Sequence, residues 1–532
     1  MIADPYERAA ELGWRITDSS QLTDDLSLDT DVAIVGTGAG GGTAAEILAR
    51  SGLRVVMIEE GALRTSRDFR MLERQAYPQL YADSAGRKTR DKGITILQGR
   101  TVGGSTTVNW TASFRTPPAT LSFWQSNYGL SDFTTEALAP WFERMERRLS
   151  IAPWSEPPNE NNAALLRGTA ALGVSAGVVP RNVRACHNLG YCGMGCPTNA
   201  KQSMLVTTIP GALDRGATLL ARAFAARLRT DGNRASSLEC DALDADGLRK
   251  TGRRITVRAH AFVCAAGGIG TPGLLLRSGV PDRSGLLGKR TFLHPTVVSA
   301  AQMPHAVDAF SGAPQSIYSD AFLETPFDGP VGFKLEVPPV HPVLVATALP
   351  GLGTQHSDLA GQMAHTHVVI ALLRDGFHRE SQGGNVAVAR DGTPVLDYPM
   401  TPYLWEGARR AFASMAEIQF AAGATAVFPL HESATPYATL EQAKAGIAAL
   451  AMKSLAARVM SAHVMGGCAM SADPACGVVD PSGRHHHLRN VYIFDGSMFP
   501  TSLGTNPQLS IYAIVARDAS RLAERMTQGP SA

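Results

Sequence analysis

The 532-residue sequence has few cysteines, no charge imbalance and no long apolar run, and each absence narrows the possible functions. Seven cysteines in a chain of this length do not form a disulfide scaffold. Lys and Arg number 49 against 47 Asp and Glu, and no basic cluster is present, which argues against a nucleic acid as partner. No stretch of about 18 apolar residues occurs, so no membrane-spanning helix is expected.

The first thirty residues also lack the features of an export signal. They are polar and mixed in charge, without a basic start followed by an apolar stretch, and without a twin-arginine pair. Together with the few cysteines, this predicts a cytoplasmic protein. A hydrophobic content of 44% and a charged fraction of 18% are typical of a globular chain, which here is long enough for two or more domains.

A strand–turn–helix–strand unit near the N-terminus is the clearest local signal that is present. An apolar strand at 31–36 enters a glycine-rich turn, an alanine-rich helix follows over about 43–50, and a second apolar strand occupies 54–59. This order within about thirty residues predicts a βαβ unit, which belongs to a parallel sheet with a right-handed crossover.

The turn matches the dinucleotide-binding pattern G-x-G-x-x-G through Gly36, Gly38 and Gly41. The first glycine permits the tight turn, the second allows close approach of a pyrophosphate, and the third lets the helix pack on the strand. Glu59, about 20 residues further on at the end of the second strand, is suited to accept hydrogen bonds from ribose hydroxyls. The unit therefore predicts a dinucleotide site, which by itself suits NAD or FAD.

Further apolar segments predict more strands of the same sheet far along the chain. Residues 261–266 lead into a predicted helix start at 271–272. Residues 490–495 precede a long helical pattern that runs from Pro507 to about Met526. If these strands share one sheet, the nucleotide-binding domain is discontinuous.

We predict the α/β fold class, with a discontinuous Rossmann-type domain at 30–125, 205–290 and 460–530. Segments 126–204 and 291–459 would form an α+β substrate-binding domain with an antiparallel sheet. Within the second segment, short apolar runs such as 365–372 are more typical of antiparallel strands than of βα units.

Three further blocks carry a resemblance to a known family. They are G-R-T-V-G-G-S-T-T-V-N at 99–109, H-V-M-G-G-C at 463–468, and D-G-S-M-F-P-T at 495–501, which continues as G-T-N-P at 504–507. With the glycine turn, their order and spacing resemble the glucose–methanol–choline (GMC) oxidoreductases, in particular the long-chain alcohol oxidase and dehydrogenase branch. That family consists of FAD enzymes that oxidise alcohols, so the resemblance implies FAD, bound non-covalently, as the cofactor.

The resemblance also implies which residues lie along the cofactor. Ala225 matches the position that touches adenine through its backbone, and Asp495 is suited to hold ribityl or phosphate groups, with a helix or turn cap as its alternative role. The implied cofactor-binding residues are Gly36, Gly38, Gly41, Glu59, Val102, Gly104, Ser105, Asn109, Trp110, Thr111, Ala112, Ala225, Asp495 and Pro507.

Two residues match the catalytic positions of the family. His463 is implied as the general base that takes the hydroxyl proton, while the carbinol hydride passes to flavin N5. Asn506 cannot act as a base and is expected to orient the hydroxyl, although it also precedes Pro507 and so suits a helix N-cap. The N-terminus of that helix is a candidate to stabilise negative charge on the reduced flavin.

Cys186, Cys192 and Cys196 form a C-x5-C-x3-C-P pattern. Its spacing resembles that of cluster-bearing glucose dehydrogenase large subunits, so iron–sulfur ligation is one hypothesis. The run G-C-P-T-N-A-K-Q-S at 195–203 resembles the flavin-only long-chain alcohol oxidases more closely. We therefore favour a structural loop over the active site, without a metal.

The predicted function is FAD-dependent oxidation of a primary or secondary alcohol to an aldehyde or ketone. The substrate is expected to be a small-molecule alcohol, with long-chain or hydrophobic alcohols suggested by the cysteine loop. The motifs leave oxygen, a quinone or a cytochrome open as the electron acceptor. Two alternatives are a lyase that cleaves cyanohydrins on the flavin fold, and a non-catalytic flavin-binding subunit of an electron-transfer complex.

Overall fold

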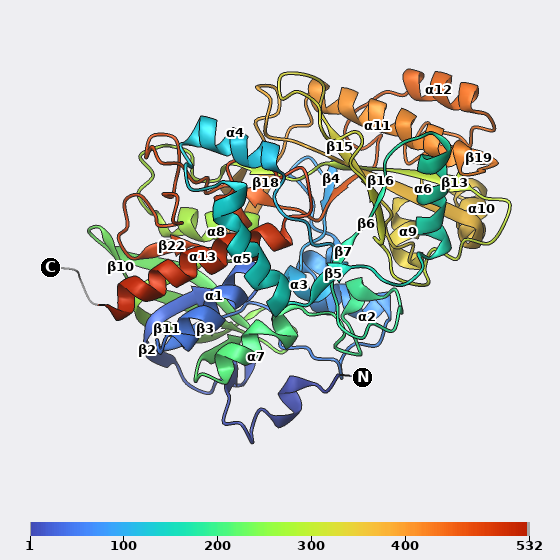
Figure 1. Cartoon of the computed structure of the whole chain (residues 1–532). Helices are drawn as coiled ribbons and strands as arrows, with labels where there is room; N and C mark the ends of the chain where they lie inside the picture. Colours follow the sequence, from blue (N-terminus) through green and yellow to red (C-terminus); the bar gives the residue numbers. More distant parts are fainter. Residues whose placement is uncertain (1, 529–532) are drawn as a thin grey trace.

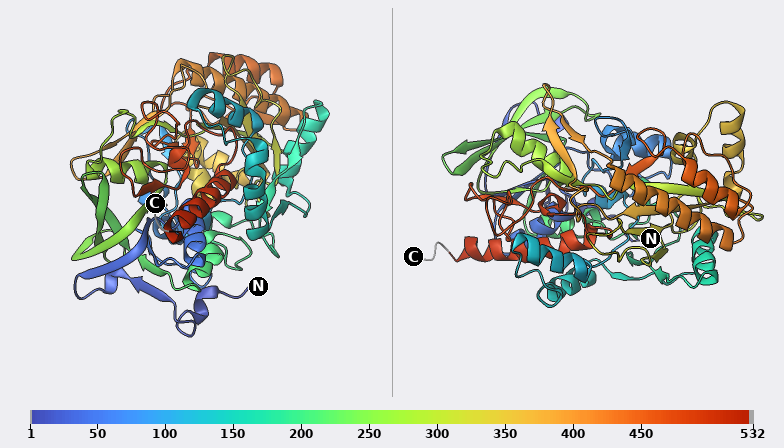
Figure 2. Two further views of the ribbon diagram at one scale, coloured as in Figure 1. Left: turned by 60° about the vertical axis from the view of Figure 1, so that its left-hand side comes forward. Right: turned by 90° about the horizontal axis from the view of Figure 1, so that it is seen from above.

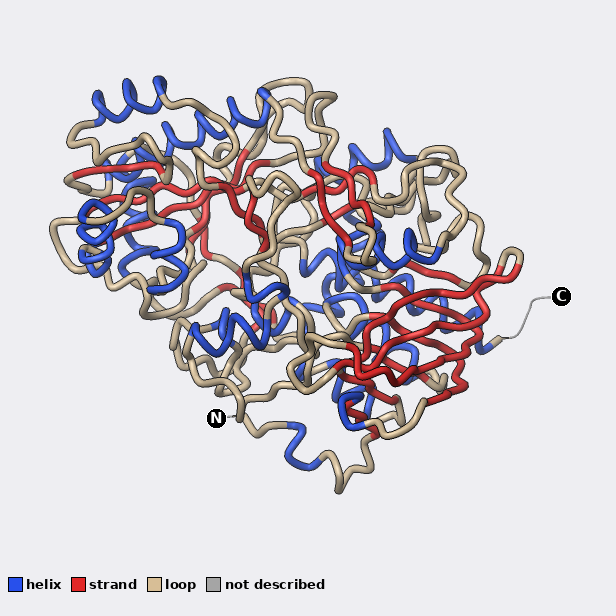
Figure 3. The backbone as a smooth tube through the Cα atoms, turned by 180° about the vertical axis from the view of Figure 1, so that it is seen from behind, coloured by secondary structure: helices blue, strands red, loops and turns tan. Residues whose placement is uncertain are grey.

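A computed structural model describes residues 2–528 of the chain. Two eight-stranded sheets dominate it and lie in different parts of the molecule (Figure 1). Seen from behind, their strands form two separate groups (Figure 3). Among the described residues, no helix combines the length and the apolar character needed to cross a membrane.

The first sheet is parallel in its centre and antiparallel at one edge. Its parallel strands pair in the order β1, β8, β3, β2 and β11, with β22 alongside β11. Their bounds are Arg15–Asp18 (β1), Thr218–Ala221 (β8), Val55–Ile58 (β3), Leu26–Val35 (β2), Lys250–Cys264 (β11) and Val491–Ile493 (β22). The antiparallel hairpin consists of β9 (Ala223–Asp231) and β10 (Arg234–Leu243).

The predicted βαβ unit and the discontinuous sheet are confirmed. Helix α1 (Ala39–Arg50) connects β2 and β3, and α13 (Gln508–Thr527) follows β22. Strand β11 begins well before the predicted 261, because its first half pairs with β10 while its second half pairs with β22. Helix α8 (Gly267–Ser278) begins before the predicted 271.

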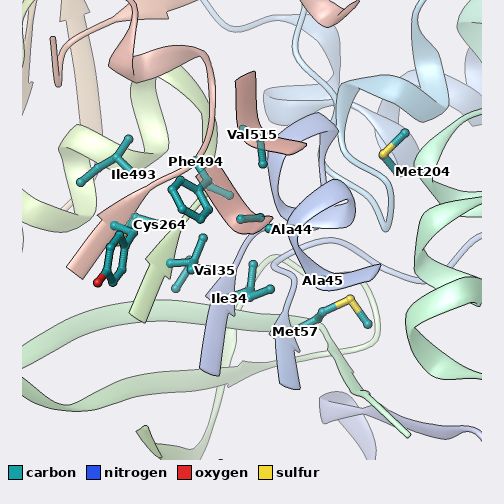
Figure 4. Packing of buried hydrophobic residues seen from close by; sticks show 14 of the residues in the cluster. Ile34, Val35, Ala44, Ala45, Met57, Met204, Cys264, Ile493, Phe494 and Val515 are labelled. Atoms are coloured by element: carbon teal, nitrogen blue, oxygen red, sulfur yellow. The ribbon is translucent and has the colours of Figure 1, made fainter. Parts of the chain in front are cut away.

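Small side chains let the helices pack closely on this sheet. Ala44 and Ala45 of α1 lie against Ile34 and Val35 of β2, and Val515 of α13 lies nearby (Figure 4). All of these residues are at most 6% exposed, so their burial contributes to the hydrophobic stabilisation of the sheet.

The second sheet is mainly antiparallel. Strand β16 (Thr366–Leu373) pairs antiparallel with β13 (Thr296–Gln302) and β15 (Phe333–Glu336), which confirms the predicted antiparallel segment. Its other strands are β4 (Ile94–Ile96), β20 (Val459–Ser461), β14 (Ile317–Ser319), β6 (Gly177–Val178) and β19 (Ala426–Pro429). Helices α11 (Pro402–Ala421) and α6 (Glu160–Ala171) pack on one face, and α12 (Leu440–Ala449) packs on α11 (Figures 1 and 2).

The remaining α-helices and β-strands connect or cover the two sheets. The helices are α2 (Glu73–Leu80), α3 (Ser105–Val108), α4 (Pro118–Tyr128), α5 (Thr135–Arg148), α7 (Thr208–Leu213), α9 (Pro342–Ala348) and α10 (Thr354–Gly361). The strands are β5 (Ile151–Pro153), β7 (Pro180–Asn182), β12 (Lys289–Phe292), β17 (Gly384–Val388), β18 (Pro394–Asp397) and β21 (Met465–Gly466).

Two elements lie differently from the predicted division into domains. Strand β4, inside the predicted nucleotide-binding segment 30–125, pairs with β20 of the second sheet. Helix α5, inside the predicted substrate-binding segment 126–204, packs against α13 and so against the first sheet. The predicted domain boundaries stay a proposal, in which β4 is now assigned to the substrate-binding domain and α5 to the nucleotide-binding domain.

Candidate active site

A cavity of about 880 Å³ is lined by residues of both sheets. It brings together segments that are hundreds of residues apart in the sequence. The predicted site residues that line it are Gly36, Gly38, Glu59, Gly104, Ser105, Asn109, Trp110, Thr111, Ala112, Ala225, His463, Asp495, Asn506 and Pro507.

Two predicted cofactor-binding residues do not line the cavity. Val102 is fully buried in the hydrophobic core, and its contact with FAD stays a prediction. Gly41 lies behind the turn, where a Cβ atom would come within 1.9 Å of the Gly36 carbonyl oxygen. This close approach of helix to strand is the role that the motif predicts for its third glycine.

The start of α1 forms an open cradle at the cavity. Gly38 is its N-cap and offers no capping side chain, so the first N–H groups of the helix are left for another acceptor. A Cβ atom on Gly38 would meet nothing closer than 3.9 Å, whereas one on Gly40 would lie 1.6 Å from the Phe494 carbonyl oxygen. Gly38 is therefore not required by the packing of the protein itself, and its lack of a side chain suits a phosphate ligand.

Glu59 lines the cavity but already holds the glycine turn in place. One carboxylate oxygen accepts from the Thr37 N–H at 3.0 Å and from its hydroxyl at 2.7 Å, and the other accepts from the Gly61 N–H at 2.9 Å. Burial raises the pKa of Glu59 above its usual value. A carboxylate has about four acceptor positions, so one remains for a ribose hydroxyl.

Asp495 acts as a cap between two elements. Its Oδ1 accepts from the Ser497 N–H at 2.8 Å, and its Oδ2 accepts from the Gly267 N–H at 2.8 Å and the Thr271 hydroxyl at 2.6 Å. These contacts confirm the alternative role as a cap. Contact of Asp495 with ribityl or phosphate groups stays a prediction.

The N-terminus of α13 faces the cavity through Pro507, Gln508 and Ile511. Pro507 is the N-cap, with no side-chain cap hydrogen bond, so the suggested capping role of Asn506 was wrong. Asn109 donates to Gln508 Oε1 at 2.6 Å, which ties the start of α13 to the segment Asn109–Ala112.

His463 lies in the cavity with a second histidine behind it. Its Nδ1 is 3.2 Å from Nδ1 of His294, whose backbone N–H donates to Asp375 Oδ1 at 3.1 Å. Burial lowers the pKa of His463 to about 4, so the ring is uncharged at neutral pH. Burial and the neighbouring His463 hold the pKa of His294 well below its usual value.

The hydrogen bonds of His294 define which nitrogens carry hydrogen in this state. The Gly504 N–H donates to His294 Nε2 at 2.9 Å, so neutral His294 carries its hydrogen on Nδ1. It then donates to Nδ1 of His463, and the single hydrogen of neutral His463 is on Nε2. No sequence motif identified His294.

Asn506 is held by a buried carboxyl group that the motifs did not identify either. Its Nδ2 donates to Glu336 Oε2 at 3.3 Å, and Gln315 Nε2 donates to the same oxygen at 2.8 Å. Burial raises the pKa of Glu336 to about 7. Within residues 2–528, Asn506 Oδ1 has no hydrogen-bond partner, although it is buried.

Two of the three cysteines of the C-x5-C-x3-C pattern contact different residues. Cys192 Sγ accepts from Arg181 at 3.6 Å, and Cys196 Sγ lies 3.4 Å from the Thr198 hydroxyl. Over residues 2–528, no cluster of His, Cys, Asp and Glu has the arrangement of a metal site. Iron–sulfur ligation by Cys186, Cys192 and Cys196 stays a hypothesis.

The second sheet supplies an apolar wall to the cavity. Alternate residues of β13 and β16 face it, while the intervening residues face α11 on the other side of the sheet. Apolar residues of α9 and of nearby loops line the cavity beside them. We call the whole set the apolar wall, and its members are Val298, Ala300, Val340, Leu344, Val345, Leu349, Val368, Ile370, Leu372 and Leu430. None of the cavity residues between 296 and 372 carries a charge.

Comparison with known proteins identifies the family. Family models described as GMC oxidoreductase match residues 57–296 and 380–515. The long-chain-alcohol oxidase FAO1 of Arabidopsis thaliana is 27% identical over 98% of this chain and 70% of its own length. An uncharacterized GMC-type oxidoreductase of Mycobacterium tuberculosis is 30% identical over 95% of this chain and 79% of its own length.

Two solved structures have the same fold. A formate oxidase variant from Aspergillus oryzae superposes with a TM-score of 0.68 at 15% identity, covering 94% of this chain and 99% of that one. Pyridoxine 4-oxidase from Mesorbium loti gives 0.66 at 18% identity, covering 93% and 99%. Together with the two family models and the geometry of the cavity, these matches establish that the chain belongs to the GMC oxidoreductases and is a flavoprotein with FAD as its cofactor.

Proposed function

We propose that this oxidoreductase oxidises a hydrophobic primary or secondary alcohol to the aldehyde or ketone. The observation that carries the proposal is the apolar wall, which lines the same cavity as His463 and Asn506. An uncharged wall favours alkyl chains over charged or highly hydroxylated substrates, because burying a charge or an unpaired polar group is costly. The similarity to long-chain-alcohol oxidases supports the same substrate class.

The cavity fits FAD at its nucleotide end. The uncapped start of α1 offers N–H groups to a pyrophosphate, and the missing side chain of Gly38 leaves space for it. Glu59 and Ala225 line the part of the cavity suited to the adenosine. We propose that FAD is held there without a covalent bond, and that when bound it supplies the hydride acceptor.

We propose that His463 and Asn506 hold the hydroxyl group, with His463 as the general base and Asn506 as the orienting residue. The low pKa of His463 keeps its ring neutral, so a proton-accepting form is available at neutral pH. Asn506 offers its free Oδ1 and the second hydrogen of Nδ2 to the hydroxyl.

The base role has one requirement that follows from His294. While His294 donates to Nδ1 of His463, Nε2 of His463 carries hydrogen and cannot accept another. We propose that the His463 ring leaves this contact when cofactor and alcohol bind, and so takes up the tautomer with a free Nε2.

The test is an anaerobic mixing experiment. Purified, FAD-loaded protein is mixed with straight-chain alcohols of increasing length. Reduction of the flavin is followed as the loss of its absorbance at about 450 nm. Each buried CH₂ is worth about 0.8 kcal/mol, so kcat/KM should rise roughly fourfold per carbon until the wall is filled. No loss of absorbance with any alcohol would contradict the proposal.

The same experiment distinguishes the alternatives. Release of a carbonyl compound from a cyanohydrin without loss of flavin absorbance would favour the lyase, and absence of both reactions would favour a non-catalytic subunit. Admitting air after reduction tests the acceptor. We propose oxygen, in line with the relatives that are named oxidases, and reoxidation only by a quinone or a cytochrome would contradict that part.

A further inference from the structure

The loop that contains the three cysteines also contains Lys201, a buried cation that contacts the backbone of the segment 107–109. Lys201 is only 3% exposed. Its ammonium group donates to the carbonyl oxygens of Thr107 at 2.6 Å, Asn109 at 2.9 Å and Cys192 at 2.8 Å. These three bonds use all three of its hydrogens, so Lys201 joins the cysteine loop to the segment 107–109.

Arg181 of β7 forms hydrogen bonds with the next residues of the same segment, Trp110 and Thr111. It is fully buried, and its Nε donates to the Thr111 hydroxyl at 2.7 Å, while its Nη2 donates to the Trp110 carbonyl oxygen at 3.2 Å. Its guanidinium group also lies over the Trp154 ring at 4.9 Å. Thr111 has a φ of 70°, a conformation that a residue other than glycine keeps only when its surroundings hold it.

Neither cation is neutralised. Among residues 2–528, neither Lys201 nor Arg181 forms an ion pair with a carboxylate; both bind carbonyl and hydroxyl oxygens, and Arg181 also donates to the Cys192 thiol. Burial lowers the pKa of Lys201 to about 8, so the ammonium form still predominates at pH 7. Buried charges act over longer distances than exposed ones, because little water screens them.

The segment that they hold lines the cavity through Asn109, Trp110, Thr111 and Ala112. Asn109 is bonded to Gln508 at the start of α13, and Asn506 and Pro507 line the same region. The two cations therefore lie behind the part of the cavity wall next to Asn506 and the start of α13, where the proposed reaction requires the flavin ring.

We propose that Lys201 and Arg181 are positioning residues that fix the segment Thr107–Ala112 and raise the midpoint potential of the bound flavin through their two unneutralised positive charges. Positive potential favours the reduced flavin, because reduction adds negative charge to the ring. The proposal deepens the proposed alcohol oxidation and gives the cysteine loop a role that uses Lys201 rather than its thiols.

The test compares midpoint potentials and sulfite binding of FAD-loaded variants. In Lys201→Met and Arg181→Met, the midpoint potential of the flavin should fall, and the Kd for sulfite, which binds better to electron-poor flavins, should rise at least tenfold. Arg181→Lys keeps the charge and should stay close to the unmodified protein in both measurements. If a methionine variant does not fold, the corresponding glutamine variant is measured in its place, because glutamine removes the charge but keeps a hydrogen-bond donor.

The matched control is Arg222→Met. Arg222 is also a buried arginine, but Asp18 pairs with it, so its loss should leave the midpoint potential unchanged. A purely structural role of Lys201 and Arg181 would lower FAD content or Tm without changing the potential of the flavin that remains bound, and that result would overturn the proposal. Neither measurement involves an alcohol, so the outcome is independent of the proposed substrate.

Discussion

The two residues of the proposed hydroxyl-binding pair differ in what holds them. His463 is backed by a neutral histidine, and Asn506 is backed by a carboxyl group. Replacing each backing residue therefore tests a different property of the site.

Replacing His463 should have a far larger effect on rate than replacing its partner. His463→Ala should slow anaerobic flavin reduction by roughly the 10²–10⁴-fold expected for a lost general base. His294→Leu removes the Nδ1–H donor, so it should change the rate by less than about tenfold. Stopped-flow measurement at saturating alcohol checks both variants. An equal loss in the two would mean that the histidines act as a unit and that His463 does not leave His294 during the reaction.

Glu336→Gln should change how stability depends on pH. The folded-state pKa of Glu336 is about 7, above the usual 4.5. Its stabilising contribution is therefore fully present below pH 4.5 and is lost as the pH rises through 7. The variant should gain up to roughly 3 kcal/mol relative to the unmodified protein across this window. Urea unfolding of both proteins at several values from about pH 4 to about pH 8 measures the difference in their free energies of unfolding. A difference that does not change with pH would contradict the raised pKa of Glu336.

At the start of α1, one glycine is needed for the proposed cofactor binding and another is needed for packing of the protein itself. Gly38→Ala adds a methyl group where the protein leaves space, so the Tm of the apoprotein should not change, while FAD binding should be weakened or lost. Gly40→Ala drives a methyl group into the Phe494 carbonyl, so it should lower the Tm of the apoprotein itself. Fluorescence titration with FAD and thermal unfolding distinguish the two, and normal FAD affinity in Gly38→Ala would contradict the assignment of the phosphate site.

Strand β16 offers a matched pair for the substrate pocket. Val368 belongs to the apolar wall, and its neighbour Val369 faces the core under α11. Val368→Thr should flatten the rise of kcat/KM with alcohol chain length, because it puts a hydroxyl group in the wall. Val369→Thr has the same chemistry on the opposite face and should lower stability without changing the chain-length dependence. The same change in both variants would show that the effect is not specific to the wall.

The sequence predicted those parts of the fold and site that depend on local patterns. The strand–turn–helix–strand unit was correct because its glycines and apolar runs are adjacent in the chain. The first half of β11 was missed because its charged, alternating residues pair with β10 of the antiparallel hairpin and do not form an apolar run. His294 and Glu336 belong to no motif, and only the packing of β12, β15 and β21 with the end of the chain brings them to His463 and Asn506.

For the whole molecule, the position of the cavity predicts that FAD stabilises the fold. The cavity is built from segments that are far apart in the sequence, so the proposed FAD site exists only in the folded state. At a free FAD concentration 100 times its Kd, the expected stabilisation is about 2.7 kcal/mol. Removal of FAD should therefore lower Tm, and titrating FAD back should raise it continuously, as differential scanning calorimetry would record. A Tm that is independent of FAD would contradict this.

The alternation of residues along β13 and β16 has a consequence for how the protein can diversify. Even-numbered positions such as 298, 368 and 370 face the cavity, and odd-numbered positions such as 297, 369 and 371 face the core. In these short strands, residues that shape the cavity thus alternate with residues that pack under α11, and the cavity-facing residues also pack against one another. Libraries that vary only the even-numbered positions should yield folded variants with altered alcohol preference far more often than libraries that vary the odd-numbered ones.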